Sequence, residues 1–205
     1  MSAAPRSADA VLERLLEGNA RFAADRKLNE GHDTGRREEL AAGQEPDAVV
    51  LGCADSRVPP DVIFDAGLGE LFVVRVAGNT AGAAAVLGSV EFAVTQLGSP
   101  LVLVLGHEGC GAVAGAVAAE RDGESLPGAI GEAIAPIAPV VATIAQDEPQ
   151  LDRDALVERA VVANVEATVG DLVAHSPAVA ERVESGATKV VGAVYRLGSG
   201  RIDLL

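Results

Sequence analysis

The sequence predicts an α/β fold, with a mainly parallel central β-sheet flanked by helices and an N-terminal helical arm. Short apolar runs bounded by turn residues, typical of buried strands, alternate with longer segments of helical periodicity. This alternation favours parallel strands joined by helical crossovers. A length of 205 residues suits one compact unit with a full hydrophobic core. We therefore expect a single domain over 1–205, with the arm over 1–45 and the α/β core over 46–205.

The N-terminal arm is predicted to contain two helices. Apolar residues recur at helical spacing from about Ala8 to Arg26, with Ser7 as a suitable N-cap. A polar stretch over 27–33 follows, and a second, short helix should end near Gly43. Arms of this kind often clasp a partner subunit.

The core begins at Ala48, where the pattern changes to short apolar runs. The expected strands are 48–52, 71–76, 101–106 and 190–197. The expected helices between them are 82–97, 111–120, 129–145 and 153–174. Residues 198–200 are typical of a hairpin turn, which would lead into a last short strand over 201–205.

Charge and hydropathy argue against several classes of partner. The chain has 30 acidic and 16 basic side chains, and its formal charge of -14 would repel nucleic acid and anionic lipid. The apolar stretch near 134–145 is shorter than the ~20 residues of a membrane helix, and Pro136 and Pro139 interrupt it. The first residues do not have the pattern of a secretion signal. We expect a cytoplasmic protein with no nucleic-acid or membrane partner.

Two cysteines and one histidine follow predicted strands in a pattern that indicates a metal site. Cys53 follows the first strand, while His107 and Cys110 follow the third. Ligands gather at the carboxyl ends of parallel strands, so the three side chains could face one pocket. Two thiolates and an imidazole suit zinc, and three protein ligands leave the fourth position open, as catalytic sites require.

Each of these features also has a simpler interpretation. A single buried cysteine is usually a small apolar residue, and Asp55 with Arg57 could be a surface ion pair of little energetic value. His32 and His175 are expected to be solvated surface groups. The glycines of 109–115 imitate a dinucleotide-binding turn, but the acidic residue that such a site needs about 20 residues later is missing.

The motifs C-x-D-S-R at 53–57, R-V-A-G-N at 75–79 and H-x-x-C at 107–110 together resemble the β-class carbonic anhydrases. The resemblance covers nearly the whole chain. It implies reversible hydration of carbon dioxide to bicarbonate and a proton by attack of zinc-bound hydroxide. It also implies a homodimer or homotetramer with pockets at the subunit interface.

The resemblance implies one zinc ion per subunit and assigns roles to eight residues. These are the metal ligands Cys53, His107 and Cys110, the catalytic residues Asp55 and Arg57, and the substrate-binding residues Phe72, Ala77 and Gly111. Asp55 would orient the zinc-bound water, and Arg57 would hold Asp55. A guanidinium pairs with a carboxylate through two aligned hydrogen bonds, so Arg57 would both orient Asp55 and keep it ionised.

Some alternatives remain open at this stage. A hydrolase of carbonyl sulfide or carbon disulfide on the same scaffold would have the same metal ligands. A non-enzymatic zinc or thiol redox sensor would use Cys53 and Cys110, but it leaves the pairing of Asp55 with Arg57 unexplained. At low pH, Asp55 could itself ligate zinc and close the site. Val50 stands where one bacterial subgroup has a tryptophan of an inhibitory bicarbonate site, which argues against that inhibition here.

Overall fold

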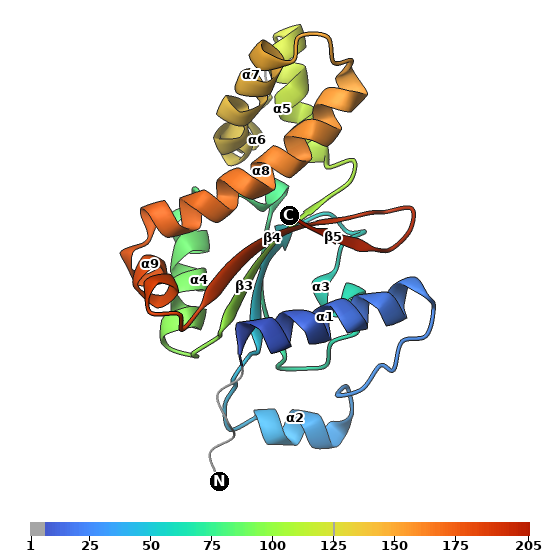
Figure 1. The fold of residues 1–205 in the computed structure, drawn as a ribbon, viewed down its shortest axis with the longest axis vertical. Coiled ribbons are helices and arrows are strands. Elements are labelled where there is room, and N and C mark those ends of the chain that lie inside the picture. Colours follow the sequence, from blue (N-terminus) through green and yellow to red (C-terminus); the bar gives the residue numbers. More distant parts are fainter. Residues whose placement is uncertain (1–6, 125) are drawn as a thin grey trace.

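The computed structural model describes residues 7–124 and 126–205, so the first six residues of the predicted arm lie outside the described residues. Its centre is a five-stranded sheet in the order β2-β1-β3-β4-β5 (Figure 1). The strands are β1 (Ala48–Cys53), β2 (Leu71–Val76), β3 (Leu101–His107), β4 (Lys189–Tyr195) and β5 (Ile202–Leu204). The first four run parallel, and β5 pairs antiparallel with β4. The predicted fold class is confirmed.

Helices cover the sheet and extend beyond one end of it. They are α1 (Ala8–Ala23), α2 (Thr34–Leu40), α3 (Pro60–Ile63), α4 (Ala84–Thr95), α5 (Gly111–Asp122), α6 (Ala129–Ile134), α7 (Ala138–Asp147), α8 (Arg153–His175) and α9 (Pro177–Glu184). Helix α4 packs on β1 and β2, α8 packs on β3 and β4, and α9 contacts both helices. Helices α5, α6 and α7 form a projection with one end of α8, at the top of Figure 1.

The expected helix over 129–145 is divided into α6, a 3-10 turn and α7. Pro136 lies inside the 3-10 turn η2 (Ala135–Ile137), and Pro139 lies in the first turn of α7. A proline lacks an N–H and crowds the preceding turn, which accounts for the division of this helix. By length and composition alone, Ala129–Asp147 could cross a membrane. Its buried spine instead packs on α5 and α8, and consists of Ile134, Ile137, Val141 and Ile144.

The sequence did not predict α3 and α9. Both are short and begin with a proline, whose fixed backbone angle suits the first position of a helix. The N-cap prediction is confirmed, because the Ser7 side chain accepts a hydrogen bond from the Ala10 N–H. The helix that follows ends at Ala23, three residues before the predicted Arg26.

Helix α1 of the arm packs against its own chain. Val11 and Leu15 are buried. The amide of Asn19 donates to the carbonyls of Ile63 and Gly200, and its oxygen accepts from the Ile202 N–H. These bonds connect the arm to the hairpin between β4 and β5. Helix α2, by contrast, has no buried residue.

The central strands bring the candidate site together. Every residue of β1 and β3 is buried, as expected for parallel strands covered on both faces. The two strands are paired in parallel, with Gly52 opposite Leu105. Their carboxyl ends therefore lie at the same edge, where β1 ends at Cys53 and β3 ends at His107.

Candidate metal centre

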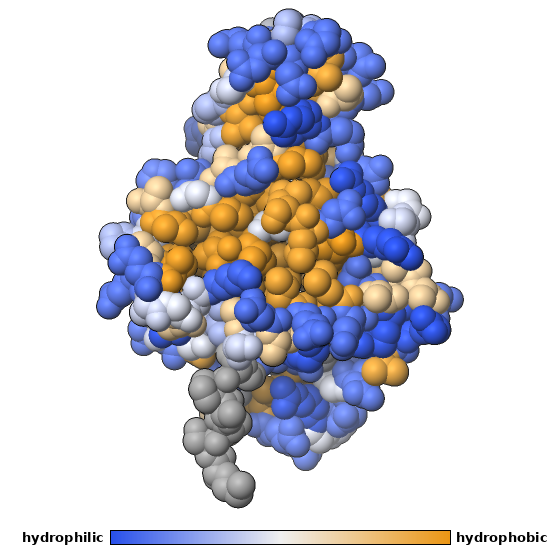
Figure 2. Space-filling model, viewed as in Figure 1, coloured by the Kyte–Doolittle hydropathy of each residue, from blue (hydrophilic) through white to orange (hydrophobic). Residues whose placement is uncertain are grey.

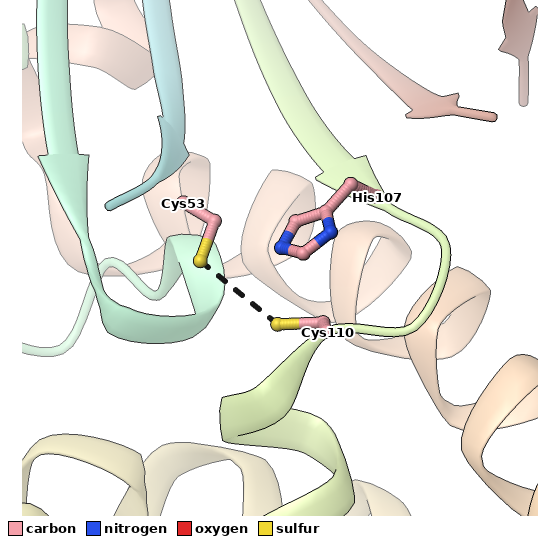
Figure 3. A group of neighbouring side chains, drawn as sticks. All are labelled: Cys53, His107 and Cys110. Atoms are coloured by element: carbon pink, nitrogen blue, oxygen red, sulfur yellow. Dashed lines mark hydrogen bonds between the residues drawn. The ribbon is translucent and has the colours of Figure 1, made fainter. Parts of the chain in front are cut away.

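Cys53, His107 and Cys110 form a compact buried group (Figure 3). Cys53 is the last residue of β1 and His107 the last of β3, while Cys110 is the N-cap of α5. Their candidate ligand atoms all lie within 4.8 Å of one another. The three side chains point toward one another across the gap between the strand ends and the helix (Figure 3). Residues that are far apart in the sequence thus form a single set of candidate metal ligands, the donor set.

The dimensions of this group fit a tetrahedral zinc ion. The two sulfur atoms are 3.9 Å apart. Two thiolates about 2.3 Å from one tetrahedral ion would be about 3.8 Å apart, so the thiols need almost no movement to bind it. Three donors leave one coordination position for a reactant, which distinguishes a catalytic site from a four-ligand structural site.

The imidazole of His107 is oriented to donate a lone pair. Its Nδ1 is 2.9 Å from the Glu108 carbonyl oxygen. A carbonyl can only accept, so Nδ1 carries the hydrogen and Nε2 presents a lone pair. Among the residues that the structure describes, this Nε2 is one of the few buried side-chain atoms with no hydrogen-bond partner. A metal ion would satisfy it.

The two thiols are electrostatically linked. Their hydrogen bond lowers the pKa of Cys53 and raises the pKa of Cys110, which burial raises further. The Gly78 N–H, 3.4 Å from the Cys53 sulfur, also favours the Cys53 thiolate. Zinc binds cysteines as thiolates, so its binding releases protons and zinc affinity should rise with pH.

Asp55 and Arg57 lie at the margin of the donor set. The Arg57 Nε and Nη2 atoms donate to the two carboxylate oxygens of Asp55 at 2.9 and 2.7 Å. This pairing holds the pKa of Asp55 far below its usual range, against the opposing effect of burial. The Asp55 Oδ2 is 3.9 Å from the His107 Nε2, so an ionised carboxylate faces the donor atoms.

The substrate-binding residues predicted from the resemblance lie in two different places. Ala77 follows β2 beside Cys53, and Gly111 is the first residue of α5; both are exposed near the donor set. Phe72 is different, because it pairs with Val49 in the sheet while Cys53 pairs with Val76. Four residues of strand, about 13 Å, separate Phe72 from the level of Cys53. Its ring lies instead beside Phe92, 6.4 Å between centroids.

The sequence reasoning gave no role to two residues that contribute to the site, although Arg75 stands in one of the motifs. Arg75, on β2, donates from Nε to the Cys53 carbonyl at 2.8 Å and from Nη2 to the Asp55 carbonyl at 2.5 Å. It thereby fixes the backbone between the first ligand and the acidic residue. A charged residue inside the apolar run 71–76 was the signal for it. Glu158, on α8, lies in none of the three motifs, and no feature of the sequence singled it out. Its carboxylate accepts a hydrogen bond from the Gly109 N–H.

The two other histidines are exposed, as predicted. His32 lies in the segment before α2. His175 ends α8, where its Nδ1 is 3.6 Å from Asp171. Neither belongs to the group of Cys53, His107 and Cys110.

Comparison with known proteins identifies the family. The sequence profile of the carbonic anhydrase family matches residues 48–202. Carbonic anhydrase 2 of Mycobacterium tuberculosis is 45% identical over 195 residues, covering 95% of this chain and 91% of the relative. The carbonic anhydrase of Mycolicibacterium smegmatis is 40% identical over 195 residues, covering 95% and 92%.

Solved structures agree with the sequence comparison. A tetrameric β-carbonic anhydrase from Sordaria macrospora superposes with a TM-score of 0.77 at 26% identity, covering 95% of this chain and 96% of that one. The β-carbonic anhydrase of Coccomyxa in complex with acetazolamide superposes with a TM-score of 0.76 at 30% identity, covering 95% and 86%. The chain therefore belongs to the β-class carbonic anhydrases, enzymes that catalyse the hydration of carbon dioxide.

Proposed function

We propose that one zinc ion per subunit, held by Cys53, His107 and Cys110, serves the reversible hydration of carbon dioxide to bicarbonate and a proton. The observation that carries the proposal is the donor set itself. Two sulfurs 3.9 Å apart and a buried, unpartnered Nε2 fit a tetrahedral ion without rearrangement. When bound, zinc lowers the pKa of a water molecule and so makes hydroxide available near neutral pH.

Asp55 is the proposed orienting group for the attacking water. Its Oδ2 faces the donor atoms and is ionised, so it can accept a hydrogen bond from the O–H of the nucleophile. This bond would aim an oxygen lone pair at the carbon of carbon dioxide. Arg57 keeps the carboxylate ionised and fixes its plane through two hydrogen bonds.

Carbon dioxide is proposed to lie beside Ala77 and Gly111. The Ala77 methyl group offers an apolar wall next to Cys53, which suits an uncharged substrate. Gly111 opens α5, and the positive end of the helix dipole at the N-terminus favours negative charge. Charge develops on the oxygens of carbon dioxide as bicarbonate forms, so this helix end favours the product side of the reaction.

The proposal is tested by stopped-flow hydration of carbon dioxide on wild type and Asp55→Asn, with zinc content measured on both. The amide keeps the shape of Asp55 but loses its charge. We expect the rate to fall by about 10- to 100-fold with zinc retained. Asp154→Asn, an exposed carboxylate at the start of α8, is the matched control and should keep the wild-type rate. A reduced wild-type protein that cannot be loaded with zinc would refute the assignment.

We further propose that the enzyme is a homodimer or homotetramer. The tetrameric relative from Sordaria macrospora supports this proposal. So does Phe92, which is 48% exposed beside Phe72 near the β2 edge of the sheet. Since Phe72 lies far from the metal ligands of its own chain, it could line a carbon dioxide pocket only in a partner subunit. A cytoplasmic location is also proposed, because the donor set needs two reduced thiols.

A further inference from the structure

The turn between His107 and Cys110 determines how two of the three metal ligands are spaced. It consists of Glu108 and Gly109, and Gly109 has a φ of 61°. Glycine adopts the left-handed region about as readily as other conformations, so Gly109 permits this turn without fixing it. Contacts with the rest of the molecule can therefore hold its shape.

Gly109 is hydrogen-bonded on both sides of its backbone. Its N–H donates to the Glu158 Oε1 at 3.3 Å. Its carbonyl oxygen accepts from the Arg57 Nη2 at 3.4 Å. The same Arg57 atom donates to the Asp55 Oδ2 at 2.7 Å. A continuous chain of hydrogen bonds therefore runs from Glu158 through Gly109 and Arg57 to Asp55.

Glu158 is itself held by the hairpin between β4 and β5. Its Oε2 lies 3.4 Å from the Arg196 Nη1. The Arg196 Nε donates to Asp203 at 2.7 Å. These two carboxylates raise the pKa of Arg196, with Asp203 the larger influence. Glu158 thus has one oxygen on the ligand turn and the other on a paired arginine, which restricts its rotamers.

The other residue of the turn is fixed to the same hairpin. The Glu108 N–H donates to the Tyr195 carbonyl at 2.9 Å, which continues the pairing of β3 with β4. The Glu108 Oε2 accepts from the Leu197 N–H at 3.0 Å. Glu108 therefore anchors the start of the turn, while Glu158 is the side chain on the N–H of Gly109, next to Cys110.

We propose that Glu158 is a positioning residue for the hydration reaction, which sets the His107–Cys110 turn and, through Gly109, the aim of Arg57 and Asp55. The inference rests on the proposed zinc-dependent function. Hydrogen-bond partners outside the ligands typically change metal affinity or activity by about 10- to 100-fold when removed. Because Glu158 acts on both a ligand and the orienting pair, its loss should affect zinc retention and turnover together.

The experiment compares zinc-loaded wild type with Glu158→Ala, Glu158→Gln and Glu166→Ala. Glutamine keeps an oxygen that can accept from the Gly109 N–H, whereas alanine does not. Glu166 is an exposed residue two turns further along α8, and its substitution removes the same charge. Four quantities are measured: the rate of zinc release to a chelator, the visible absorption of the cobalt(II)-substituted protein, kcat for carbon dioxide hydration, and the urea midpoint of unfolding.

We expect Glu158→Ala to release zinc about tenfold faster than Glu166→Ala, with a shifted cobalt spectrum and a lower kcat. Glu158→Gln should recover most of each difference. Arg196→Gln should change the same quantities in the same direction but by less. It replaces Glu158→Ala in the comparison if that variant folds poorly. A general loss of stability would change the urea midpoint without altering the cobalt spectrum.

The failures of the two proposals are distinguishable. A wild type that neither holds zinc nor hydrates carbon dioxide would refute the proposed function. A fully active wild type, with Glu158→Ala matching Glu166→Ala in zinc release and cobalt spectrum, would refute the role of Glu158 alone. A Glu158→Gln protein as impaired as Glu158→Ala would refute the hydrogen bond to Gly109 as the cause.

Discussion

Asp65 shows how a single buried carboxylate can attach a polar segment to the core. Its side chain is 1% exposed. It accepts hydrogen bonds from the Arg21 Nε at 2.8 Å and from the N–H groups of Leu28 and Asn29 at 2.9 and 3.0 Å. Burial raises the pKa of Asp65, but these donors outweigh burial, and the pKa lies below its ordinary value. The charged form is therefore the one that stabilises the fold.

The pKa of Asp65 leads to a pH-dependent prediction for Asp65→Asn. A carboxylate with a lowered pKa in the folded state contributes stability that is fully present above its unfolded pKa, about 3.9. This contribution is lost as pH falls through the lower folded pKa. We expect Asp65→Asn to be less stable than wild type by about 2 kcal/mol at pH 7, and the difference to shrink below pH 4. Urea unfolding between pH 3 and 7 measures both.

Asp61→Asn is the control, because Asp61 is an exposed carboxylate on α3 in the same part of the chain. Its stability should follow the wild type across the pH range. Zinc loss at low pH affects all three proteins alike, so the difference isolates Asp65. An Asp65→Asn protein with the wild-type pH dependence would contradict the prediction. Asp65 shares a cavity with Arg14, Glu30 and Glu70, which are left unsubstituted in every variant.

The sequence predicts the residues of the motifs better than it predicts the residues that hold them in place. The pairing of Asp55 with Arg57 follows from two positions that are two residues apart, so the sequence alone suggests it. The contact of Glu158 with Gly109 joins residues 49 positions apart. No local pattern encodes such a contact, because it depends on where α8 crosses the sheet.

Helix α8 packs on the sheet through the Val165 side chain, which lies over two glycines. A Cβ at Gly106 would lie 2.5 Å from the Val165 Cγ2, and a Cβ at Gly192 would lie 2.8 Å from the Val165 Cγ1. Gly106 is on β3 and Gly192 on β4, so Val165 packs between neighbouring strands. Since Gly106 precedes His107 and Glu158 lies two turns before Val165, this contact also sets the distance from α8 to the ligand turn.

This packing predicts non-additive stability changes. Gly106→Ala should lower the free energy of unfolding by about 1–3 kcal/mol, because the new methyl group overlaps Val165. Val165→Ala alone should lower it by about 1–3 kcal/mol through the cavity it leaves. The double variant should be more stable than the sum of the two losses by about 1 kcal/mol, because the smaller side chain makes room for the methyl group. Urea denaturation of the four proteins completes the cycle.

Gly170→Ala is the matched control on the same helix. Gly170 is exposed, and a Cβ there meets nothing within 4 Å. Alanine should raise the stability by about 0.5–1 kcal/mol, because glycine is the poorer helix former. Strict additivity of Gly106→Ala and Val165→Ala would show that Val165 does not set the packing distance.

Secondary structure followed from the sequence wherever the apolar period was clear. Strands β1, β2 and β3 and helices α4, α5 and α8 lie within a few residues of their predicted bounds. The prediction was wrong where prolines broke an apolar period, in the separation of α6 from α7. It also missed α9, which is eight residues long and carries one buried residue, too few to give a visible period.

Two features of the whole molecule have opposite effects on self-association: its net charge opposes association, and its exposed apolar surface favours it. With a formal charge of -14, two copies repel one another at long range. Figure 2 shows apolar side chains gathered over the middle of one face, where the sheet lies between α8 and α1. Leu204 and Leu205, at the β5 end of the sheet, are 46% and 51% exposed. Association through apolar contacts would bury these groups, and salt would favour it by screening the charges.

The proposed oligomer makes a prediction for the two edges of the sheet. Phe92→Glu, near β2, and Leu204→Glu, on β5, each place a charge in an apolar edge. We expect wild type to have a mass of at least twice 20.7 kDa by light scattering, and at least one variant to have half the wild-type mass. Ile130→Glu, at a 54% exposed position on α6, is the control and should keep the wild-type mass. A monomeric wild type at micromolar concentration would contradict the proposal.

The sequence by itself determined the chemistry of the site and the order of its elements. Ligand types, their attachment to strand ends, and the pairing of Asp55 with Arg57 are encoded by residues close together in the chain. The tertiary structure alone decided the 3.9 Å between the two sulfurs, the support from Arg75 and Glu158, and the distance of Phe72 from the ligands. These depend on strand register and helix packing, which arise from many contacts between residues distant in sequence and leave no local periodicity.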